Sequence, residues 1–254
     1  MYRKGKGNFW KSVKRVIREA DVLLLLLDAR FVDESRNREI EEKVRRSEKP
    51  LIYVITKADL VERERAEAWK KKLSPCVFMS AKDRSGRMRL KERIMIEASR
   101  VYGTKEKINI GVLGYPNVGK SSLINYMKGS HAAATSSHSG YTKFTQVVKS
   151  DKRLYFIDTP GVIPYMEKDD VKHVSMSVID FTKVRDPDLI VAELMRKHPG
   201  RIEAHFGVPV SDDKAKSIEE IALKKNMLMR GGVPDIDRLC RSIIRDFQSG
   251  KIKI

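Results

Sequence analysis

Four residues with the spacing of a phosphate-binding loop are the most chemically specific feature of the sequence. Gly114, Gly119, Lys120 and Ser121 fit the pattern G-x-x-x-x-G-K-[ST], which follows an apolar run and opens a helix-like segment. Glycines let backbone N–H groups curl around a phosphate, a lysine pairs with β- and γ-phosphate oxygens, and a hydroxyl ligates Mg²⁺. The spacing therefore predicts a nucleotide site in which Lys120 is catalytic and Ser121 is a magnesium ligand.

Two later segments carry residue types that can sense a third phosphate. Asp158 and Gly161 form the pattern D-x-x-G after the apolar run 154–157. An aspartate at a strand end can hold Mg²⁺ through water, and a glycine leaves the backbone free to approach the γ-phosphate. Thr142 lies between the two motifs, where a mobile loop could deliver its hydroxyl to Mg²⁺. A plain turn threonine is the alternative for Thr142.

Two strand-to-loop junctions have the residues needed to distinguish guanine from adenine. Thr56, Lys57 and Asp59 close the run "LIYVI", and "SAK" at 80–82 closes the run "CVFM". A carboxylate at Asp59 could accept hydrogen bonds from guanine N1 and the 2-amino group, and adenine lacks both donors. Lys57 would lie over the base or brace its loop, and the Ala81 N–H could contact guanine O6. These motifs favour GTP over ATP, and two ordinary turns are the alternative.

The predicted site combines these motifs with their neighbours in the phosphate loop. The nucleotide contacts are Thr56, Lys57, Asp59, Ser80, Ala81, Lys82, Asn117, Val118, Gly119, Lys120, Ser121, Ser122, Asp158 and Gly161. Catalytic roles are expected for Lys120, Thr142 and Gly161. Magnesium ligation is expected from Ser121, Thr142 and Asp158.

Apolar runs of strand length alternate with charged, helix-like segments over the first part of the chain. The runs are residues 22–27, 51–56, 76–79, 108–114, 144–148 and 154–158. Such alternation predicts an α/β fold with a mostly parallel, doubly wound sheet. After about residue 165 the strand pattern stops and helical periodicity takes over. We therefore expect a basic N-terminal arm or helix (1–20), a nucleotide-binding domain (21–164) and an all-α C-terminal domain (165–254).

The base-reading motif precedes the phosphate loop, which reverses the usual order of a GTPase chain. Sheet proteins tolerate new termini where loops lay, because the original ends lie near each other and can be joined. A cut just after the D-x-x-G motif, with the old ends linked through residues 83–107, produces the order found here. The order therefore predicts a circularly permuted domain.

With these motifs in this order, the chain resembles the circularly permuted GTPases of ribosome assembly, the YlqF/YawG family. The resemblance is carried by "DAR" and "SRN" within 28–37, "TKADL", "MSAK", "GYPNVGKSSLIN", "SGYTK", "IDTPGV" and "KKNMLMRGGVPDIDRLCRSIIRDFQSGKI". It implies a P-loop GTPase fold, GTP or GDP and Mg²⁺ as ligands, and a factor that hydrolyses GTP. It also implies a precursor of the large ribosomal subunit as partner, with the C-terminal helical domain contacting rRNA. Movement at Gly161 would tilt that domain directly.

Three departures from the family pattern bear on turnover and selectivity. Thr56 stands where most such GTPases have Asn, so guanine selectivity is expected to depend more on Asp59. Val162 stands where Ras-like enzymes have Gln, and the stretch 7–13 lacks the Gly-His-Met of bacterial relatives. We therefore expect slow intrinsic hydrolysis, with the attacking water positioned by His138, a loop backbone, rRNA or K⁺. Asn117 resembles the residue that holds K⁺ in potassium-activated GTPases.

The chain carries a large positive charge. Lys and Arg number 52 against 34 Asp and Glu, for a formal net charge of +18. Such a field attracts polyanions, so RNA or DNA is the first partner to consider, and a solvated, heat-adapted surface is the alternative. Near the C-terminus Arg238, Arg241 and Arg245 recur at helical spacing. We interpret them as a stripe that contacts RNA phosphates, and a solvent-exposed face is the alternative.

The longest apolar run, at 22–27, is far shorter than the roughly 20 residues of a membrane-spanning helix. Neither terminus has a lipidation motif. We expect a soluble, cytoplasmic, monomeric protein with no membrane partner. Two function classes compete with a slow GTPase. One is a nucleotide-gated RNA-binding module with negligible turnover, and the other is an RNA-modifying or ATP-dependent P-loop factor.

Overall fold

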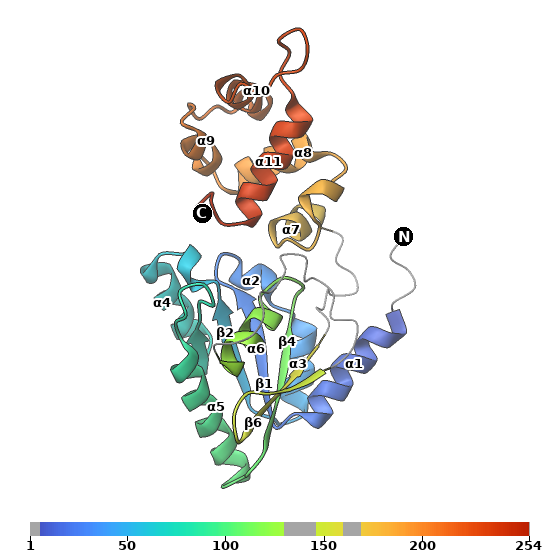
Figure 1. Ribbon diagram of the computed structural model, residues 1–254, viewed down its shortest axis with the longest axis vertical. Helices are drawn as coiled ribbons and strands as arrows, with labels where there is room; N and C mark the ends of the chain where they lie inside the picture. The colour runs from blue at the N-terminus through green and yellow to red at the C-terminus, as the bar shows by residue number, and fades with distance from the viewer. Residues whose placement is uncertain (1–5, 130–145, 160–168, 254) are drawn as a thin grey trace. The chain divides into compact units, whose positions relative to one another are not determined.

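The chain folds into two units of different architecture. The computed structural model describes residues 6–129, 146–159 and 169–253 (Figure 1). The first unit, Met1–Glu167, contains the sheet, and the second, Lys168–Ile254, is helical in the part described. None of the helices in these described ranges combines the length and the apolar character of a membrane span.

Six strands form one sheet in the order β3-β2-β1-β4-β6-β5. The pairings are parallel except that β5 runs antiparallel to β6. The mostly parallel α/β sheet expected from the sequence is confirmed. The strands are β1 (Val22–Asp28), β2 (Leu51–Thr56), β3 (Cys76–Phe78), β4 (Ile108–Gly114), β5 (Gln146–Lys149) and β6 (Leu154–Asp158).

Helices cover both faces of the sheet, which explains why β1 is buried at every position. Leu23, Leu25 and Leu27 project to one face and share an apolar cluster with Val16 of α1 and Ile40 of α3. The helix α5 lies on the other side of the sheet (Figure 1). The helices of this unit are α1 (Lys6–Glu19), α2 (Val32–Ser35), α3 (Arg38–Arg46), α4 (Arg63–Lys72), α5 (Arg87–Tyr102) and α6 (Lys120–Lys128), with the 3₁₀ turn η1 (Ala58–Leu60).

The basic N-terminal segment is part of this packing. From Lys6 onward it forms α1, in which Val13 and Val16 are 1% and 0% exposed. Lys43 of α3 places its ammonium 4.6 Å from the ring centroid of Trp10. Fully burying an aliphatic side chain contributes roughly 1.5–3 kcal/mol, so these contacts anchor the helix on the sheet.

The carboxyl ends of the parallel strands meet at one edge of the sheet. The chain crosses from β1 to β2 and β3 on one side, then returns to β4 on the other side of β1. Open α/β sheets bind ligands at such a reversal of strand order, outside the carboxyl ends of the strands. The loops after β2, β3 and β4 hold the predicted motifs, and β1 and β6 end in Asp28 and Asp158.

The helical unit has its own apolar core. Its last helix, α11, buries Leu239, Ile243 and Phe247 and packs against α8. Asp235 caps the start of α11, because its side chain accepts a hydrogen bond from the Arg238 N–H at 3.1 Å. The elements are α7 (Asp170–Ser175), η2 (Phe181–Lys183), α8 (Pro187–Lys197), α9 (Arg201–Phe206), α10 (Lys214–Lys224) and α11 (Ile236–Gln248).

Candidate nucleotide site

The phosphate loop joins the end of β4 to the start of α6. Gly114 has a φ of 148°, and a Cβ there would lie 2.8 Å from the Leu26 carbonyl oxygen, so a larger residue is excluded. Gly119 has a φ of 98° and immediately precedes the helix. Asn117 is exposed, with a φ of 58°. The N–H groups of the first helical turn are oriented as in helix N-termini that bind phosphate.

Lys120 is folded back onto this loop. Its ammonium donates hydrogen bonds to the carbonyl oxygens of Tyr115 at 2.6 Å and Gly114 at 3.2 Å. The side chain is buried, and the resulting desolvation lowers the pKa of Lys120 to about 8, an effect that the charge of Asp158 partly opposes. An arriving phosphate would supply the negative charge that favours the protonated ammonium.

Two residues with magnesium-type oxygen ligands lie at neighbouring strand and helix ends. Ser121 is half-buried in the first turn of α6, and Asp158 is buried at the end of β6. The next residue, Thr159, was not predicted as functional. Its hydroxyl donates to the Val112 carbonyl at 2.6 Å and ties the turn after β6 to β4. Thr142 and Gly161, together with Val162 and His138, lie outside the described residues.

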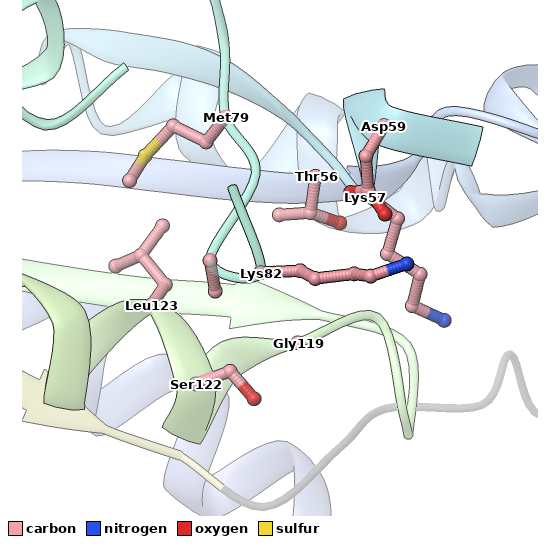
Figure 2. Close-up of a pocket in the computed structure, with 9 residues that line it drawn as sticks. Thr56, Lys57, Asp59, Met79, Lys82, Gly119, Ser122 and Leu123 are labelled. Atoms are coloured by element: carbon pink, nitrogen blue, oxygen red, sulfur yellow. The ribbon is translucent and has the colours of Figure 1, made fainter. Parts of the chain in front are cut away.

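A pocket of about 240 Å³ opens beside the phosphate loop (Figure 2). Met79 and Leu123 lie on one side of it, and the side chains of Lys57 and Lys82 extend on the other side (Figure 2). An apolar wall facing charged and polar groups suits a flat base with polar edges. The lining consists of Thr56, Lys57, Asp59, Met79, Ala81, Lys82, Gly119, Ser122 and Leu123. Seven of these residues were assigned to the nucleotide from sequence, and the two apolar ones, Met79 and Leu123, were missed.

Ser80 acts on the pocket through Asp59. The Ser80 hydroxyl donates to Asp59 Oδ1 at 2.7 Å and accepts the Asp83 N–H at 2.9 Å. The serine is 1% exposed and does not line the pocket. It therefore orients the carboxylate from behind, and Asp59 keeps further lone pairs for a ligand.

Thr56 joins the base-reading loop to the phosphate loop. Its hydroxyl lies 2.6 Å from the Val118 carbonyl oxygen and 3.0 Å from that of Leu27. Because a hydroxyl has one proton, the shorter contact takes the hydrogen bond. Val118 is buried, so its backbone, rather than its side chain, contributes to the site. Thr56 thus links the loop that follows β2 to the loop that follows β4.

Lys57 has a partner that the sequence motifs did not indicate. Its ammonium lies 2.7 Å from Asp28 Oδ2, at the end of the neighbouring strand β1. Arg30 also bonds the Asp28 carboxylate, with Nη2 at 2.9 Å from Oδ2. The sequence feature that could have indicated this partner is the "DAR" triplet, which begins at the end of a buried strand, at the edge where the carboxyl ends of parallel strands meet.

Comparison with known proteins identifies proteins that this chain resembles. A family model described as 50S ribosome-binding GTPase matches residues 109–228. An uncharacterized GTP-binding protein of Methanocaldococcus jannaschii is 38% identical over 95% of this chain, and nucleolar GTP-binding protein 2 of Neurospora crassa is 31% identical over 99%. The chain spans 65% and 42% of those two relatives.

Two solved structures of YlqF have the same fold. The GDP-bound structure has a TM-score of 0.68 at 20% identity and covers 94% of both chains. GNP-bound YlqF from T. maritima has a TM-score of 0.66 at 20% identity and covers 95% of this chain and 94% of that one. The chain therefore has the fold of the circularly permuted GTPase YlqF, and its residues 109–228 match the GTPase family model. The sheet order explains how a circularly permuted chain keeps the site, because the spatial neighbours β2, β1 and β4 do not depend on where the chain is cut.

The three arginines of the predicted stripe differ in their surroundings. Arg241 donates to the Phe181 carbonyl at 3.0 Å and pairs with Asp237, so its guanidinium holds η2 against α11. Arg238 and Arg245 are exposed on the same helix, and Arg245 lies 3.5 Å from Asp246. Arg238 and Arg245 are therefore better placed than Arg241 to meet a phosphate.

Proposed function

We propose that the protein binds GTP and GDP, hydrolyses GTP slowly, and acts as an assembly factor on the precursor of the large ribosomal subunit. The pocket carries this proposal, because there two base-reading loops meet the phosphate loop. The family description, 50S ribosome-binding GTPase, and the name nucleolar GTP-binding protein 2 support the ribosomal partner.

Guanine would be selected at Asp59. Ser80 orients the carboxylate before a ligand arrives, so Asp59 can accept hydrogen bonds from N1 and the 2-amino group of guanine together. Adenine offers neither donor and would leave the carboxylate desolvated without compensation. The backbone N–H of Ala81 would meet O6, and the side chains of Lys57 and Lys82 would flank the base.

The phosphates would lie along the start of α6. Lys120 would leave the two loop carbonyls for β- and γ-phosphate oxygens. Ser121 and Asp158 fit Mg²⁺, because a half-buried hydroxyl and a buried carboxylate are the oxygen ligands that this ion prefers. A bound Mg²⁺ would neutralise charge on the β- and γ-phosphates. We propose that Thr142 and Gly161, which lie outside the described residues, complete this end of the site.

Slow turnover follows from Val162, because an apolar side chain cannot orient the attacking water. Asn117 is exposed in the phosphate loop and could hold K⁺ beside the phosphates. The helping group would then come from K⁺, a loop backbone, His138 or rRNA. A module with negligible turnover is the competing function that Val162 favours.

The domain at 21–164 would bind the nucleotide, and the domain at 165–254 would bind RNA. Replacing Arg238 and Arg245 by Ala should weaken binding to large subunits and reduce its salt dependence, because fewer counterions are released. Filter binding over a salt series measures both quantities. The matched control is Arg196→Ala, which removes an exposed arginine of α8 that pairs with Glu193. Equal losses in both variants would contradict a specific contact.

Phosphate release from GTP, measured with and without purified large subunits, tests the proposed function. We expect slow release that KCl accelerates relative to NaCl at equal ionic strength, a further rise with subunits, and no competition by ATP. Nucleotide binding without any turnover would favour the RNA-binding module. Competition by ATP would favour an ATP-dependent factor.

A further inference from the structure

Three charged side chains meet at the carboxyl ends of β1 and β2. The Asp28 carboxylate accepts hydrogen bonds from Arg30 at Oδ1 (Nε, 3.1 Å) and Oδ2 (Nη2, 2.9 Å), and from Lys57 Nζ at Oδ2 (2.7 Å). The Asp28 and Arg30 side chains are each 2% exposed, and that of Lys57 is 26% exposed. Two cations therefore share one buried anion beside the base pocket.

The negative charge of Asp28 compensates the positive charges of both Lys57 and Arg30. Burial alone would raise the pKa of Asp28, but the charges of Lys57 and Arg30 outweigh burial and lower it well below its usual range. Desolvation lowers the pKa of Lys57, and the charge of Asp28 opposes that change. Without the carboxylate, Lys57 and Arg30 would face each other as like charges in a poorly solvated place.

The segment after β1 fixes Asp28 independently of any ligand. The Asp28 N–H donates to Ser35 Oγ at 3.1 Å, and the same hydroxyl donates to the Phe31 carbonyl at 2.6 Å. The Ala29 N–H bonds the Thr56 carbonyl at 2.9 Å, which ties this segment to the residue before Lys57. The carboxylate thus has a defined position relative to the base-reading loop.

Lys57 needs such a fixed partner. Its backbone is left-handed, with φ of 55° and ψ of 36°, a conformation that is strained for a non-glycine residue. Its four-carbon side chain has several rotatable bonds and would otherwise sample many rotamers. The bond to Asp28 holds the side chain at the pocket, where it lies with Asp59 and Thr56 (Figure 2).

We propose that Asp28 and Arg30 are positioning residues of the nucleotide site, which hold the stem of Lys57 against the bound base while Arg30 keeps Asp28 charged and oriented. This inference rests on the proposed binding of guanine nucleotides. It assigns a role in the base end of the site to a segment outside the phosphate-loop and base-reading motifs.

A double-mutant cycle on GDP affinity tests the inference, with Asp28→Asn, Lys57→Met and the double variant. We expect each single change to weaken GDP binding about tenfold. The double variant should bind GDP no worse than Lys57→Met alone, because both single changes remove the same bond between Lys57 and Asp28. Inorganic pyrophosphate, which has no base, should bind all four proteins with the same dissociation constant. A merely structural defect would weaken pyrophosphate binding too. The matched control is Asp33→Asn, an exposed carboxylate of the same segment, which should bind GDP like the unmodified protein.

If Asp28→Asn leaves two cations uncompensated and fails to fold, the GDP affinities of the double variant and of Lys57→Met still test the inference. A further loss of GDP affinity in the double variant, or unchanged affinity in Lys57→Met, would overturn the inference alone. Absence of GDP binding by the unmodified protein would overturn the proposed function and the inference with it.

Discussion

Lys120 at the phosphate end and Lys57 at the base end of the proposed nucleotide site are held in different ways. Lys120 bonds two neutral carbonyl oxygens, and desolvation lowers its pKa to about 8. Lys57 bonds a buried carboxylate that a second cation orients. The contacts at the base end are therefore formed without a nucleotide, whereas the phosphate end would gain its counter-charge from a bound nucleotide.

The largest expected effect lies at the phosphate end. Lys120→Met should weaken GDP binding by about hundredfold or more, because a charge-assisted contact with phosphate is lost. The nucleotide-free protein should melt no lower than the unmodified protein, because a desolvated ammonium is replaced by an apolar chain of similar length. Titration with a fluorescent GDP analogue and a thermal melt measure the two effects. Lys128→Met, at the exposed end of α6, is the control. If Lys120→Met bound GDP with an affinity within threefold of that of the unmodified protein, the proposed difference between the phosphate end and the base end would be contradicted.

The next effect concerns the base end. Asp59→Ala should weaken GDP binding by about 10- to 100-fold, the cost of losing hydrogen bonds to a charged acceptor. ADP binding should change little, so discrimination between the two nucleotides should shrink. Competition titrations with both nucleotides check this. Asp83→Ala keeps the backbone N–H that bonds Ser80 and should behave like the unmodified protein. Parallel loss of GDP and ADP affinity would assign Asp59 to folding instead.

The two ends should also differ in their response to pH. Without nucleotide Lys120 has a pKa of about 8, and bound phosphates raise it, so binding takes up a proton once the pH exceeds that value. GDP affinity should be flat below about pH 7 and should fall by about tenfold by about pH 9. Calorimetry in buffers of different ionisation enthalpy measures the proton uptake. In Lys120→Arg the guanidinium stays charged, and its remaining affinity should not vary over this range. Proton release, or a pH dependence retained in Lys120→Arg, would contradict this assignment.

The smallest effect is expected at Thr56, which links the base-reading loop to the phosphate loop. Thr56→Val keeps the side-chain shape but removes the donor to the Val118 carbonyl, which should cost about 1 kcal/mol of stability and about threefold in affinity. Because the hydroxyl faces protein carbonyls, GDP and inosine diphosphate should lose affinity by the same factor. A loss confined to GDP would mean that Thr56 reads the 2-amino group of guanine.

The sequence predicted those parts of the site in which a local pattern has one structural meaning. The pattern from Gly114 to Ser121 requires a strand, a turn and a helix, and the alternation of apolar runs with charged segments predicted the sheet. Because parallel strands gather their carboxyl ends at one edge, motifs separated by about 60 residues could be placed together.

Other features depend on register and side-chain reach, which the sequence did not reveal. Asp28 meets Lys57 only because Asp28 pairs with Thr56 across β1 and β2. Ser80 supports Asp59 from behind because it is buried. Arg241 bonds a carbonyl of a turn 60 residues earlier, a contact that helical spacing alone does not reveal.

A crystal structure of the protein with GDP and Mg²⁺ tests the contrast between the two ends most directly. The account predicts that Lys120 Nζ leaves the carbonyls of Gly114 and Tyr115 for phosphate oxygens, while the bonds among Asp28, Arg30 and Lys57 stay as they are. The guanine base should lie between Asp59 and the stem of Lys57. A nucleotide bound with Lys120 still on its carbonyls, or with Lys57 released from Asp28, would contradict the account.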